Sequence, residues 1–367
     1  MPSEGLVGLD LRMWNHAGIG RYIRELFGAM FRLEDPNRFT VLAYGEDEES
    51  IKTVMNGGQF VRARSKIYSL EEQAEVFKFS REVSLLHVPH FNAPFFCHSR
   101  LVVTIHDLIY LKENRFSGSV FAKGYVRGLI SGVEKNSGAV IAVSDFTRRD
   151  IEKSFPRLSG RISVIHEAAS SVFRAGERAV ERDLISKFGL SGEYVLFVGS
   201  LKAHKNIPVL LDALESIIKS GVSAQLAIVG RKDLKETALL ERIKNSGSFV
   251  RYLGEQSDDN LALLYQGARA LVIPSLWEGF GLTAVEAMAC GTPVISSDRA
   301  SLPEVVGDAG LLFDPENQEQ LVEHLVNVFQ DDELRNVLSC KGLERTKVFS
   351  WDNAARKTFA LYQKVLS

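Results

Sequence analysis

Short apolar runs rich in β-branched residues recur along this chain, and helix-forming stretches separate them. Several runs are continuous rather than alternating, which is typical of strands covered on both faces. The runs are Leu6–Leu11, Phe39–Tyr44, Ser84–Pro89, Leu101–His106, Ala139–Ser144, Ile162–His166, Tyr194–Ser200, Gln225–Gly230, Val250–Gly254, Ala270–Ser275, Pro293–Asp298 and Gly310–Asp314. This alternation predicts an α/β fold with doubly wound parallel sheets and right-handed crossovers.

The strand–helix pattern restarts halfway along the chain. The stretch between Val172 and Gly192 is charged and carries no strand, and Tyr194 then opens a second series. We therefore expect two Rossmann-like domains, residues 1–172 and 173–349, that face each other across a cleft. Ligands of such sheets bind outside the carboxyl ends of the strands.

The last helical stretch predicts a return to the first domain. Ser350 can cap a helix over residues 350–367 with its hydroxyl. An apolar stripe along this helix needs a surface to cover. Its members are Ala355, Phe359, Tyr362 and Leu366.

Bulk properties exclude several classes of protein. The 367 residues suffice for two cores, and the net charge of -2 gives no basic field for nucleic acid. The cysteines Cys97, Cys290 and Cys340 are too few and scattered for a disulfide framework or a closed zinc site. No signal-peptide pattern and no run of 18 apolar residues is present, so we expect a cytoplasmic protein.

The segment from Ser275 to Pro293, SLWEGFGLTAVEAMACGTPV, predicts an anion site. A turn with two glycines follows a strand, and a helix begins near Leu282 and ends near Gly291, an αL position. Glycines let backbone approach a ligand, and the free N–H groups at the helix start suit a phosphate.

Two carboxylates bracket this anion site. Glu286 lies about one turn, roughly 6 Å, into the helix and can accept hydrogen bonds from a ribose diol. Glu278, in the turn, can do the same for sugar hydroxyls. Either residue alone is readily a solvated glutamate, but together, with Gly-Phe-Gly between them, they suit a nucleotide sugar.

Glu278-x7-Glu286 inside PSLWEGFGLTAVEAMACGTPV closely resembles the signature of retaining glycosyltransferases of family 4, which have the GT-B fold. ISSDRASLPEVVGDAGLLFDP, GIGRY, VVTIHD, VGSLKAHKN and the terminal FSW helix are similar to that family as well, in the right order. The resemblance implies that residues 1–172 with the 350–367 helix form the acceptor side and residues 173–349 bind the donor.

The resemblance also implies roles for individual residues. Glu278 would contact the donor sugar, Glu286 would hold the ribose, and Lys205 would neutralise the diphosphate. The remaining donor contacts would be the backbone of Gly279, Phe280, Gly281 and Leu282, with Thr283 beside a phosphate. A fixed cation would stabilise the charge that develops on the leaving diphosphate.

One loop departs from the commonest form of the family. Ser200 stands where many members have an arginine, and the spacing to Lys205 is one residue shorter. The loop resembles a subgroup with Gly-Thr-Leu-Glu-Pro-Arg-Lys-Asn that is rich in mannosyltransferases. Lys202, His204 or Arg231 are the alternatives for the missing positive or donor group.

In the first domain, Gly18-Ile19-Gly20-Arg21 precedes a helix and can form an anion-binding nest; an ordinary turn is the alternative. His106 ends a strand and resembles the family histidine near the donor sugar; the alternative is a structural histidine bonded to backbone. Acceptor-side candidates are Trp14, Asn15, Tyr110, Phe116 and Tyr125.

Basic residues are scattered over the first domain, at Arg115, Lys123, Arg127, Arg148, Arg149 and Lys153. Because acidic residues are mixed in, they indicate a solvated helix face, with a peripheral contact to anionic lipid as the alternative. No Asp-x-Asp or His-Glu-x-x-His occurs, so we expect no metal and no cofactor besides the donor.

The resulting hypothesis is retaining transfer of a hexose, with mannose from GDP-mannose favoured, to a glycan or lipid-linked acceptor in polysaccharide assembly such as that of lipopolysaccharide. A UDP- or dTDP-sugar donor and a nucleotide-sugar epimerase of GT-B architecture are the alternatives. A dehydrogenase is disfavoured because Ile23 stands where the dinucleotide fingerprint needs a glycine. A non-catalytic sensor of sugar nucleotides would bind donor without turnover.

Overall fold

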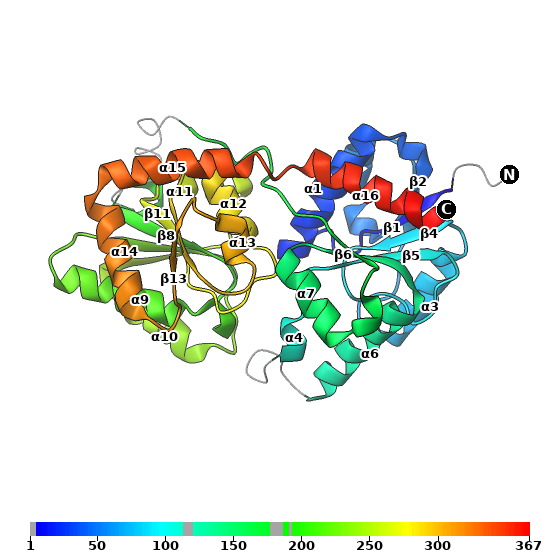
Figure 1. Ribbon diagram of the computed structural model, residues 1–367, viewed down its shortest axis with the longest axis horizontal. Coiled ribbons are helices and arrows are strands. Elements are labelled where there is room, and N and C mark those ends of the chain that lie inside the picture. The colour runs from blue at the N-terminus through cyan, green and yellow to red at the C-terminus, as the bar shows by residue number, and fades with distance from the viewer. Residues whose placement is uncertain (1–4, 113–119, 177–185, 191–192) are drawn as a thin grey trace. The chain divides into compact units, whose positions relative to one another are not determined.

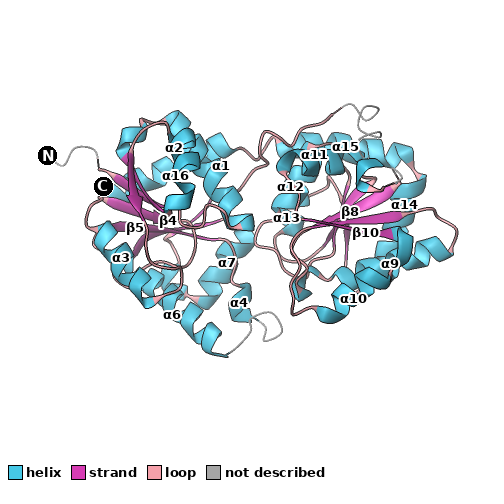
Figure 2. Cartoon of the chain, turned by 180° about the vertical axis from the view of Figure 1, so that it is seen from behind, coloured by secondary structure: helices cyan, strands magenta, loops and turns pink. Residues whose placement is uncertain are grey.

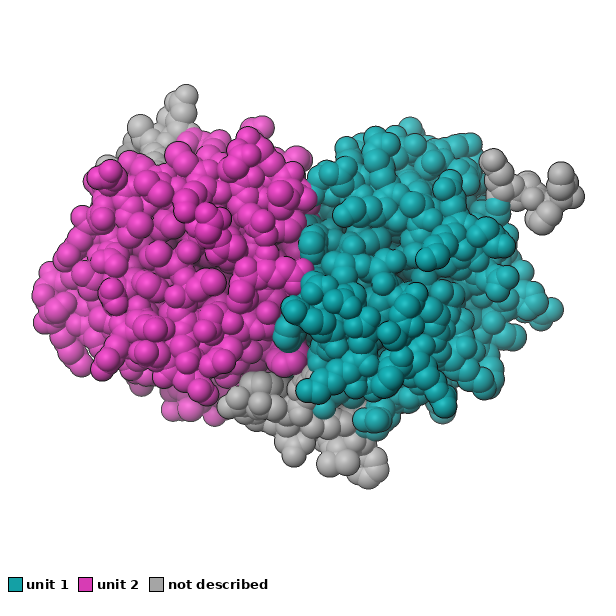
Figure 3. All heavy atoms as spheres, in the orientation of Figure 1, with its two compact units in different colours: residues 1–167, 350–367 teal, residues 168–349 magenta. Residues whose placement is uncertain are grey.

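The computed structural model describes residues 5–112, 120–176, 186–190 and 193–367. The chain divides into two compact units, residues 1–167 with 350–367 and residues 168–349 (Figure 3). Each unit is an α/β sandwich with one wholly parallel sheet and helices on both of its faces (Figures 1 and 2). The predicted fold class is therefore confirmed.

Unit 1 contains a seven-stranded sheet in the order β3-β2-β1-β4-β5-β6-β7. The strands are β1 (Val7–Asp10), β2 (Phe39–Ala43), β3 (Gln59–Arg62), β4 (Leu85–Val88), β5 (Arg100–Ile105), β6 (Ser137–Ala142) and β7 (Ile162–Val164). The α-helices are α1 (Ala17–Leu33), α2 (Glu48–Met55), α3 (Leu70–Ser80), α4 (Ile109–Lys112), α6 (Val120–Asn136), α7 (Asp145–Ser154) and α16 (Trp351–Leu366). The order reverses between β1 and β4.

Unit 2 contains a six-stranded sheet in the order β10-β9-β8-β11-β12-β13. The strands are β8 (Tyr194–Val198), β9 (Gln225–Val229), β10 (Val250–Gly254), β11 (Ala270–Ile273), β12 (Val294–Ser297) and β13 (Leu311–Phe313). The α-helices are α9 (Ile207–Lys219), α10 (Thr237–Asn245), α11 (Asp258–Gly267), α12 (Leu282–Ala289), α13 (Leu302–Val306), α14 (Gln318–Gln330) and α15 (Asp332–Thr346). Here the order reverses between β8 and β11.

The central strands of each sheet are buried because they are apolar on both faces. In unit 2, one core cluster joins β8 and β9 to α9, α10 and α14, which line one face of the sheet (Figure 1). In unit 1, a cluster joins β4, β5 and β6 to α3 and α6. Continuous apolar strands leave no solvent face, so helices must cover both sides.

The C-terminal helix α16 belongs to unit 1, as the sequence predicts, and packs along α1 (Figure 1). The Ser350 hydroxyl accepts a hydrogen bond from the Asn353 N–H at 3.3 Å, which caps the helix. Tyr362 is buried, but Leu366 is exposed, so the predicted apolar stripe ends one turn early.

Candidate functional site

The predicted donor residues of unit 2 gather at the point where its strand order reverses, whereas Gly18 and Gly20, also predicted to bind the donor, lie in unit 1. β8 and β11 are neighbours at the reversal point, and the segments that follow them carry Lys205 and Glu278. Chains leave the two strands in opposite directions, which opens a place for a ligand outside their carboxyl ends. Parallel pairing thus brings together two loops that lie more than seventy residues apart.

The loop after β8 is fixed by a close approach between two glycines. A Cβ on Gly230, at φ +138°, would lie 2.0 Å from the Gly199 carbonyl oxygen, so only glycine fits there. The Leu201 N–H donates to the Arg231 carbonyl at 3.0 Å. The chain then makes a short 3-10 turn, Ala203–Lys205, which presents Lys205 beside β11.

Lys205 and Glu278 form an ion pair. The Lys205 Nζ donates to Glu278 Oε1 at 2.6 Å, and the Ser275 hydroxyl donates to the same oxygen at 2.7 Å. Both charged side chains are 16% exposed. The predicted diphosphate lysine and the predicted sugar carboxylate are therefore direct neighbours.

The turn that carries Glu278 is held in place by hydrogen bonds from one serine, Ser301. The Ser301 hydroxyl lies 3.0 Å from the Glu278 carbonyl and 2.8 Å from the Phe280 carbonyl, at hydrogen-bonding distance from both. Gly281 has φ +103°, and a Cβ there would lie 2.8 Å from Leu302. This left-handed residue precedes α12, which begins without a side-chain cap.

The helix α12 begins at Leu282, where the sequence predicts a helix start. Leu282 and Thr283 are half-buried, whereas Phe280 is buried with its ring edge-on to Phe349 at 5.6 Å. An uncapped N-terminus carries partial positive charge from its unpaired amides. α12 ends with Gly291 at φ +73°, the predicted αL residue.

Glu286 is not a solvated helix residue, because it is only 2% exposed. Its Oε2 accepts a hydrogen bond at 3.0 Å from the hydroxyl of Tyr265 on α11. The Tyr265 ring packs edge-on against Phe173 at 5.7 Å. A buried carboxylate needs such donors, since an uncompensated charge is costly away from water.

Charge around the ion pair is set by burial and by Lys205. Burial raises the pKa of Glu278, but the charge and hydrogen bond of Lys205 outweigh it and leave that pKa below its ordinary value. Burial, with a contribution from Lys205, lowers the pKa of His204 to about 4. His204 is therefore neutral at pH 7 and supplies no second positive charge.

The other candidates for the missing arginine are placed differently. Ser200 is half-buried, while Lys202 and Arg231 are exposed. Arg231 is tied to the loop through its carbonyl, which accepts the Leu201 N–H. Two exposed cations thus lie close to the loop that carries Lys205.

In unit 1, His106 follows β5 and has both ring nitrogens engaged. Nδ1 lies 3.0 Å from Glu167 Oε1, and Nε2 lies 3.0 Å from the Pro89 carbonyl oxygen. Burial lowers the pKa of His106, but Glu167 outweighs it and raises that pKa above its ordinary value. Only an imidazolium donates from both nitrogens at once.

The nest predicted at Gly18 and Gly20 is absent, because α1 already begins at Ala17. A nest needs alternating right- and left-handed residues, and neither glycine has a positive φ. Gly20 instead permits close packing, since a Cβ there would lie 2.4 Å from the Trp14 carbonyl oxygen. A Cβ on Gly18 would meet nothing within 4 Å.

The acceptor-side candidates do not form one group. Trp14 is buried, Asn15 is exposed and donates to Asp47, and Tyr110 is exposed with its ring 6.4 Å from that of Phe91. Phe116 and the side chain of Tyr125 lie outside the described residues, as do Arg115 and the side chain of Lys123.

Two of the basic residues on α7, Arg148 and Arg149, are paired within their own helix. Arg148 binds Asp145 at 2.7 Å and Glu152 at 2.8 Å, and Arg149 lies 3.4 Å from Asp145. These pairs fit the solvated-face interpretation. In the described part of the chain, no helix is long and apolar enough to cross a membrane.

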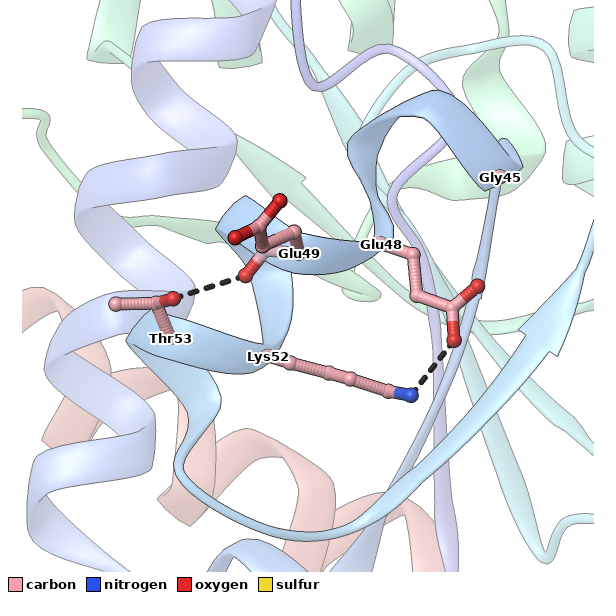
Figure 4. Close-up of a pocket in the computed structure, with 5 residues that line it drawn as sticks. All are labelled: Gly45, Glu48, Glu49, Lys52 and Thr53. Atoms are coloured by element: carbon pink, nitrogen blue, oxygen red, sulfur yellow. Dashed lines mark hydrogen bonds and ion pairs between the residues drawn. The ribbon is translucent and has the colours of Figure 1, made fainter.

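A surface hollow on unit 1 is unrelated to the predicted donor residues (Figure 4). It lies on α2, where Lys52 binds Glu48 at 2.6 Å and the Thr53 hydroxyl donates to the Glu49 carbonyl. These are ordinary pairs between successive helical turns. Within the described ranges, no group of three metal-binding side chains occurs.

Sequence reasoning missed three residues that position the candidate site. Ser301 holds the Glu278 turn, Tyr265 holds Glu286, and Glu167 holds His106. Each is remote in sequence from its partner. The family-like ASLPEVV segment is the one signal that pointed toward Ser301.

Solved structures share this architecture over nearly the whole chain. A sucrose-phosphate synthase from Thermosynechococcus elongatus aligns at a TM-score of 0.77 and 22% identity, covering 98% of both chains. HepE of Anabaena, solved with UDP and glucose, aligns at 0.79 and 17% identity, covering 98% of this chain and 100% of its own. The fold is therefore that of the GT-B glycosyltransferases.

Comparison with a family model and with curated relatives identifies the family of glycosyltransferases to which the chain belongs. The family model of glycosyl transferases group 1 matches residues 183–345. The O-antigen chain mannosyltransferase B of Escherichia coli is 32% identical over 283 residues, covering 76% of this chain and 74% of its own. The serotype-specific mannosyltransferase WbdA of the same species is 27% identical over 76% of this chain and 35% of its own. The chain belongs to the group 1 glycosyltransferases, family 4.

Proposed function

We propose that this protein transfers mannose from GDP-mannose, with retention of configuration, to a glycan or lipid-linked acceptor in surface-polysaccharide assembly. One observation carries the proposal: Lys205 and Glu278 meet at 2.6 Å where the strand order of unit 2 reverses. A cation for a diphosphate and a carboxylate for sugar hydroxyls thus lie at the place where such sheets bind ligands.

The ion pair leaves binding capacity on both partners. An ammonium group has three donors, and Glu278 takes one of them, so Lys205 can also hold a diphosphate oxygen. Lys205 and Ser275 both donate to Glu278 Oε1. The second carboxylate oxygen, Oε2, would accept a hydrogen bond from the donor sugar.

The N-terminus of α12 would bind the diphosphate. Gly281 brings the backbone close, and the amides of Leu282 and Thr283 lie in the first turn of the helix. Glu286, one turn further along, would accept hydrogen bonds from the ribose diol while Tyr265 fixes its position.

The reaction would break the bond between the anomeric carbon and the diphosphate oxygen. The acceptor oxygen would attack from the face that the diphosphate leaves, and a diphosphate oxygen would take the acceptor proton. Lys205 and the helix amides would stabilise the charge on the departing diphosphate. We propose that these protein groups suffice without a metal ion, so that EDTA leaves the rate unchanged.

Mannose is favoured by the relatives and by the loop after β8. Two curated relatives carry the name mannosyltransferase, and the Ser200–Lys205 loop resembles a mannosyltransferase-rich subgroup. A UDP-sugar is the alternative, since HepE was solved with UDP-glucose. The role of His106 beside the donor sugar stays a prediction.

A calorimetric screen of GDP-mannose, UDP-glucose, dTDP-glucose and ADP-glucose tests the proposal. GDP-mannose should bind most tightly, and Glu286→Ala should weaken it by about 1.5–3 kcal/mol, because one partner of a buried charged hydrogen bond is lost. Glu319→Ala, on an exposed helix face, is the matched control. Unchanged affinity in Glu286→Ala would remove the ribose assignment.

Product analysis separates transfer from epimerisation. Transfer yields free GDP with a lengthened acceptor whose new linkage keeps the donor's anomeric configuration, which NMR reads directly. An isomerised nucleotide sugar without GDP release would favour the epimerase.

A lipid-linked acceptor would place the reaction at the inner face of the membrane. Sedimentation with anionic vesicles at low salt tests this part alone. If no protein sediments, the peripheral contact is dropped while the transfer reaction stands.

A further inference from the structure

Unit 1 has a reversal point of its own, and a small cavity lies there. Asp10 ends β1, while His90 and Asn92 follow the neighbouring strand β4. With Arg12 they line a cavity whose volume, about 10 Å³ for the centre of a water-sized sphere, holds one oxygen atom. This is the position at which a doubly wound sheet binds ligand.

Two buried charges, Asp10 and Arg12, line the cavity, and a third, Glu72, lies behind Arg12. Arg12 donates to Asp10 Oδ1 at 2.8 Å and to Oδ2 at 2.5 Å, and its Nη1 lies 2.8 Å from Glu72 Oε1. The exposed fractions of Asp10, Arg12 and Glu72 are 5%, 4% and 0%. Such triads are often no more stabilising than apolar residues, so their presence here calls for a role beyond stability.

With Asp10 and Glu72 both ionised the charges of this triad sum to minus one, although burial raises the pKa of Glu72 above its ordinary value. Burial lowers the pKa of His90 well below its ordinary value, so the neighbouring imidazole adds no positive charge at pH 7. Glu72 accepts from Asn92 Nδ2 at 2.6 Å and from the Tyr68 N–H at 2.6 Å. The cavity therefore repels a phosphate or a carboxylate and admits a neutral group.

Two polar atoms at the cavity are unsatisfied. Asn92 is 4% exposed, and its Oδ1 meets no donor among the described residues. Asn92 lines the cavity, and its Nδ2 already donates to Glu72, so Oδ1 is the side-chain atom that remains for a ligand. Arg12 Nη1, despite its approach to Glu72, finds no acceptor in hydrogen-bonding geometry within the described ranges.

The cavity offers an acceptor, Asn92 Oδ1, a donor, Arg12 Nη1, and room for one oxygen atom. Together these complement a hydroxyl group. A hydroxyl accepts from Arg12 Nη1 and donates to Asn92 Oδ1, which neither an anion nor an apolar group does. Since buried polar atoms are rarely left unpaired, a ligand hydroxyl gains two hydrogen bonds by entering.

We propose that this cavity is the acceptor subsite, and that it binds one hydroxyl of a neutral sugar rather than a phosphate of a lipid carrier. The inference rests on the proposed transfer reaction, for which it names the acceptor end. Met13 and Ile67, both half-buried, also line the cavity and would contact the apolar face of that sugar.

The test uses the full chain with methyl α-mannoside and inorganic phosphate as separate probes, each followed by ligand-observed NMR. Methyl α-mannoside should bind and phosphate should not compete with it. Asn92→Ala should weaken the mannoside about tenfold, the value of one buried hydrogen bond. Asn37→Ala, an exposed asparagine of the same unit, is the matched control.

The four monodeoxy derivatives of methyl α-mannoside keep the test valid if Asn92→Ala does not fold. With the unaltered protein, one derivative should bind about tenfold more weakly than the other three. In a folded Asn92→Ala variant that difference should disappear, which a merely structural asparagine would not cause.

Three results would overturn the subsite: equal binding of all four derivatives, displacement of the mannoside by phosphate, or no mannoside binding, which would leave the cavity to a structural water. GDP-mannose titrated in parallel should bind wild type and Asn92→Ala equally. If the wild-type protein binds GDP-mannose but no mannoside, the subsite alone is rejected. If the wild-type protein does not bind GDP-mannose, the proposed function is rejected.

Discussion

The two units differ in the polar residues that they place at the point where the strand order of the sheet reverses. Each sheet reverses its strand order once and places polar residues at that point. In unit 2 the charged pair Lys205–Glu278 is 16% exposed, whereas in unit 1 Arg12 is almost wholly enclosed between Asp10 and Glu72. The half-open pair suits a charged ligand that competes for the lysine, and the enclosed triad suits a single neutral group.

The largest effect is expected from Arg12→Met, which leaves two carboxylates buried without their cation. The free energy of unfolding of unit 1 should fall by about 3–5 kcal/mol. Trp14 and Trp351 lie in unit 1 and Trp277 in unit 2, so urea unfolding followed by fluorescence in a Trp277→Phe background reports on unit 1.

A triple variant provides the control for Arg12→Met. Asp10→Asn, Arg12→Met and Glu72→Gln together remove all three charges and should recover most of the lost stability. If Arg12→Met alone proved as stable as wild type, the triad could not be the enclosed charge cluster described above.

Lys205→Met should act on rate rather than on folding. Removing a group that stabilises the departing diphosphate costs about 10²–10³-fold in kcat. Initial rates of GDP release measure this, with Lys219→Met on the exposed end of α9 as the control. A Lys205→Met enzyme with near-normal kcat would mean that another cation holds the diphosphate.

The pair His106–Glu167 should contribute stability that depends on pH. Because its folded pKa lies above the unfolded value near 6.5, the contribution is complete below pH 6.5 and disappears as pH rises through the folded pKa. Glu167→Gln should therefore cost about 1.5–3 kcal/mol at pH 6 and progressively less at higher pH. A pH-independent cost would show that His106 is neutral in the folded protein.

The smallest effect is expected from Arg231→Ala. An exposed cation contributes about 1 kcal/mol or less, so GDP-mannose affinity should fall by at most several-fold, and less at high salt. Calorimetry at two salt concentrations measures the change. If Lys202→Ala weakens binding and Arg231→Ala does not, Lys202 supplies the positive charge of the family arginine, whose position Ser200 occupies here.

The sequence predicted the strands well because they are buried on both faces. Every apolar run expected as a strand forms one, whereas β3 was missed. Gln59 and Arg62 on β3 are exposed at the edge of the sheet, so no apolar run marks it. The pattern Gly18–Gly20 predicted a nest that does not form. Gly20 is needed because α1 packs closely against the Trp14 carbonyl, not because the chain turns there.

The parts of the site that are close together in the sequence could be predicted, whereas the parts that the fold brings together from distant segments could not. Glu278, Gly281 and Glu286 lie within nine residues, so spacing alone relates them. The cavity of unit 1 unites Asp10 and Asn92, and its triad adds Glu72 from α3. Only the parallel pairing of β1 with β4 and the placement of α3 bring these residues together, and no local pattern encodes that.

The position of α16 has a consequence for synthesis on the ribosome. This helix completes unit 1 by burying Tyr362, whose hydroxyl lies 2.5 Å from His87 Nδ1 on β4. It follows the whole of unit 2 in the chain. Domains generally fold in the order in which they emerge, but here unit 2 can finish while unit 1 still lacks a helix. The side of unit 1 that α16 covers, including α1, therefore stays exposed until translation has passed unit 2.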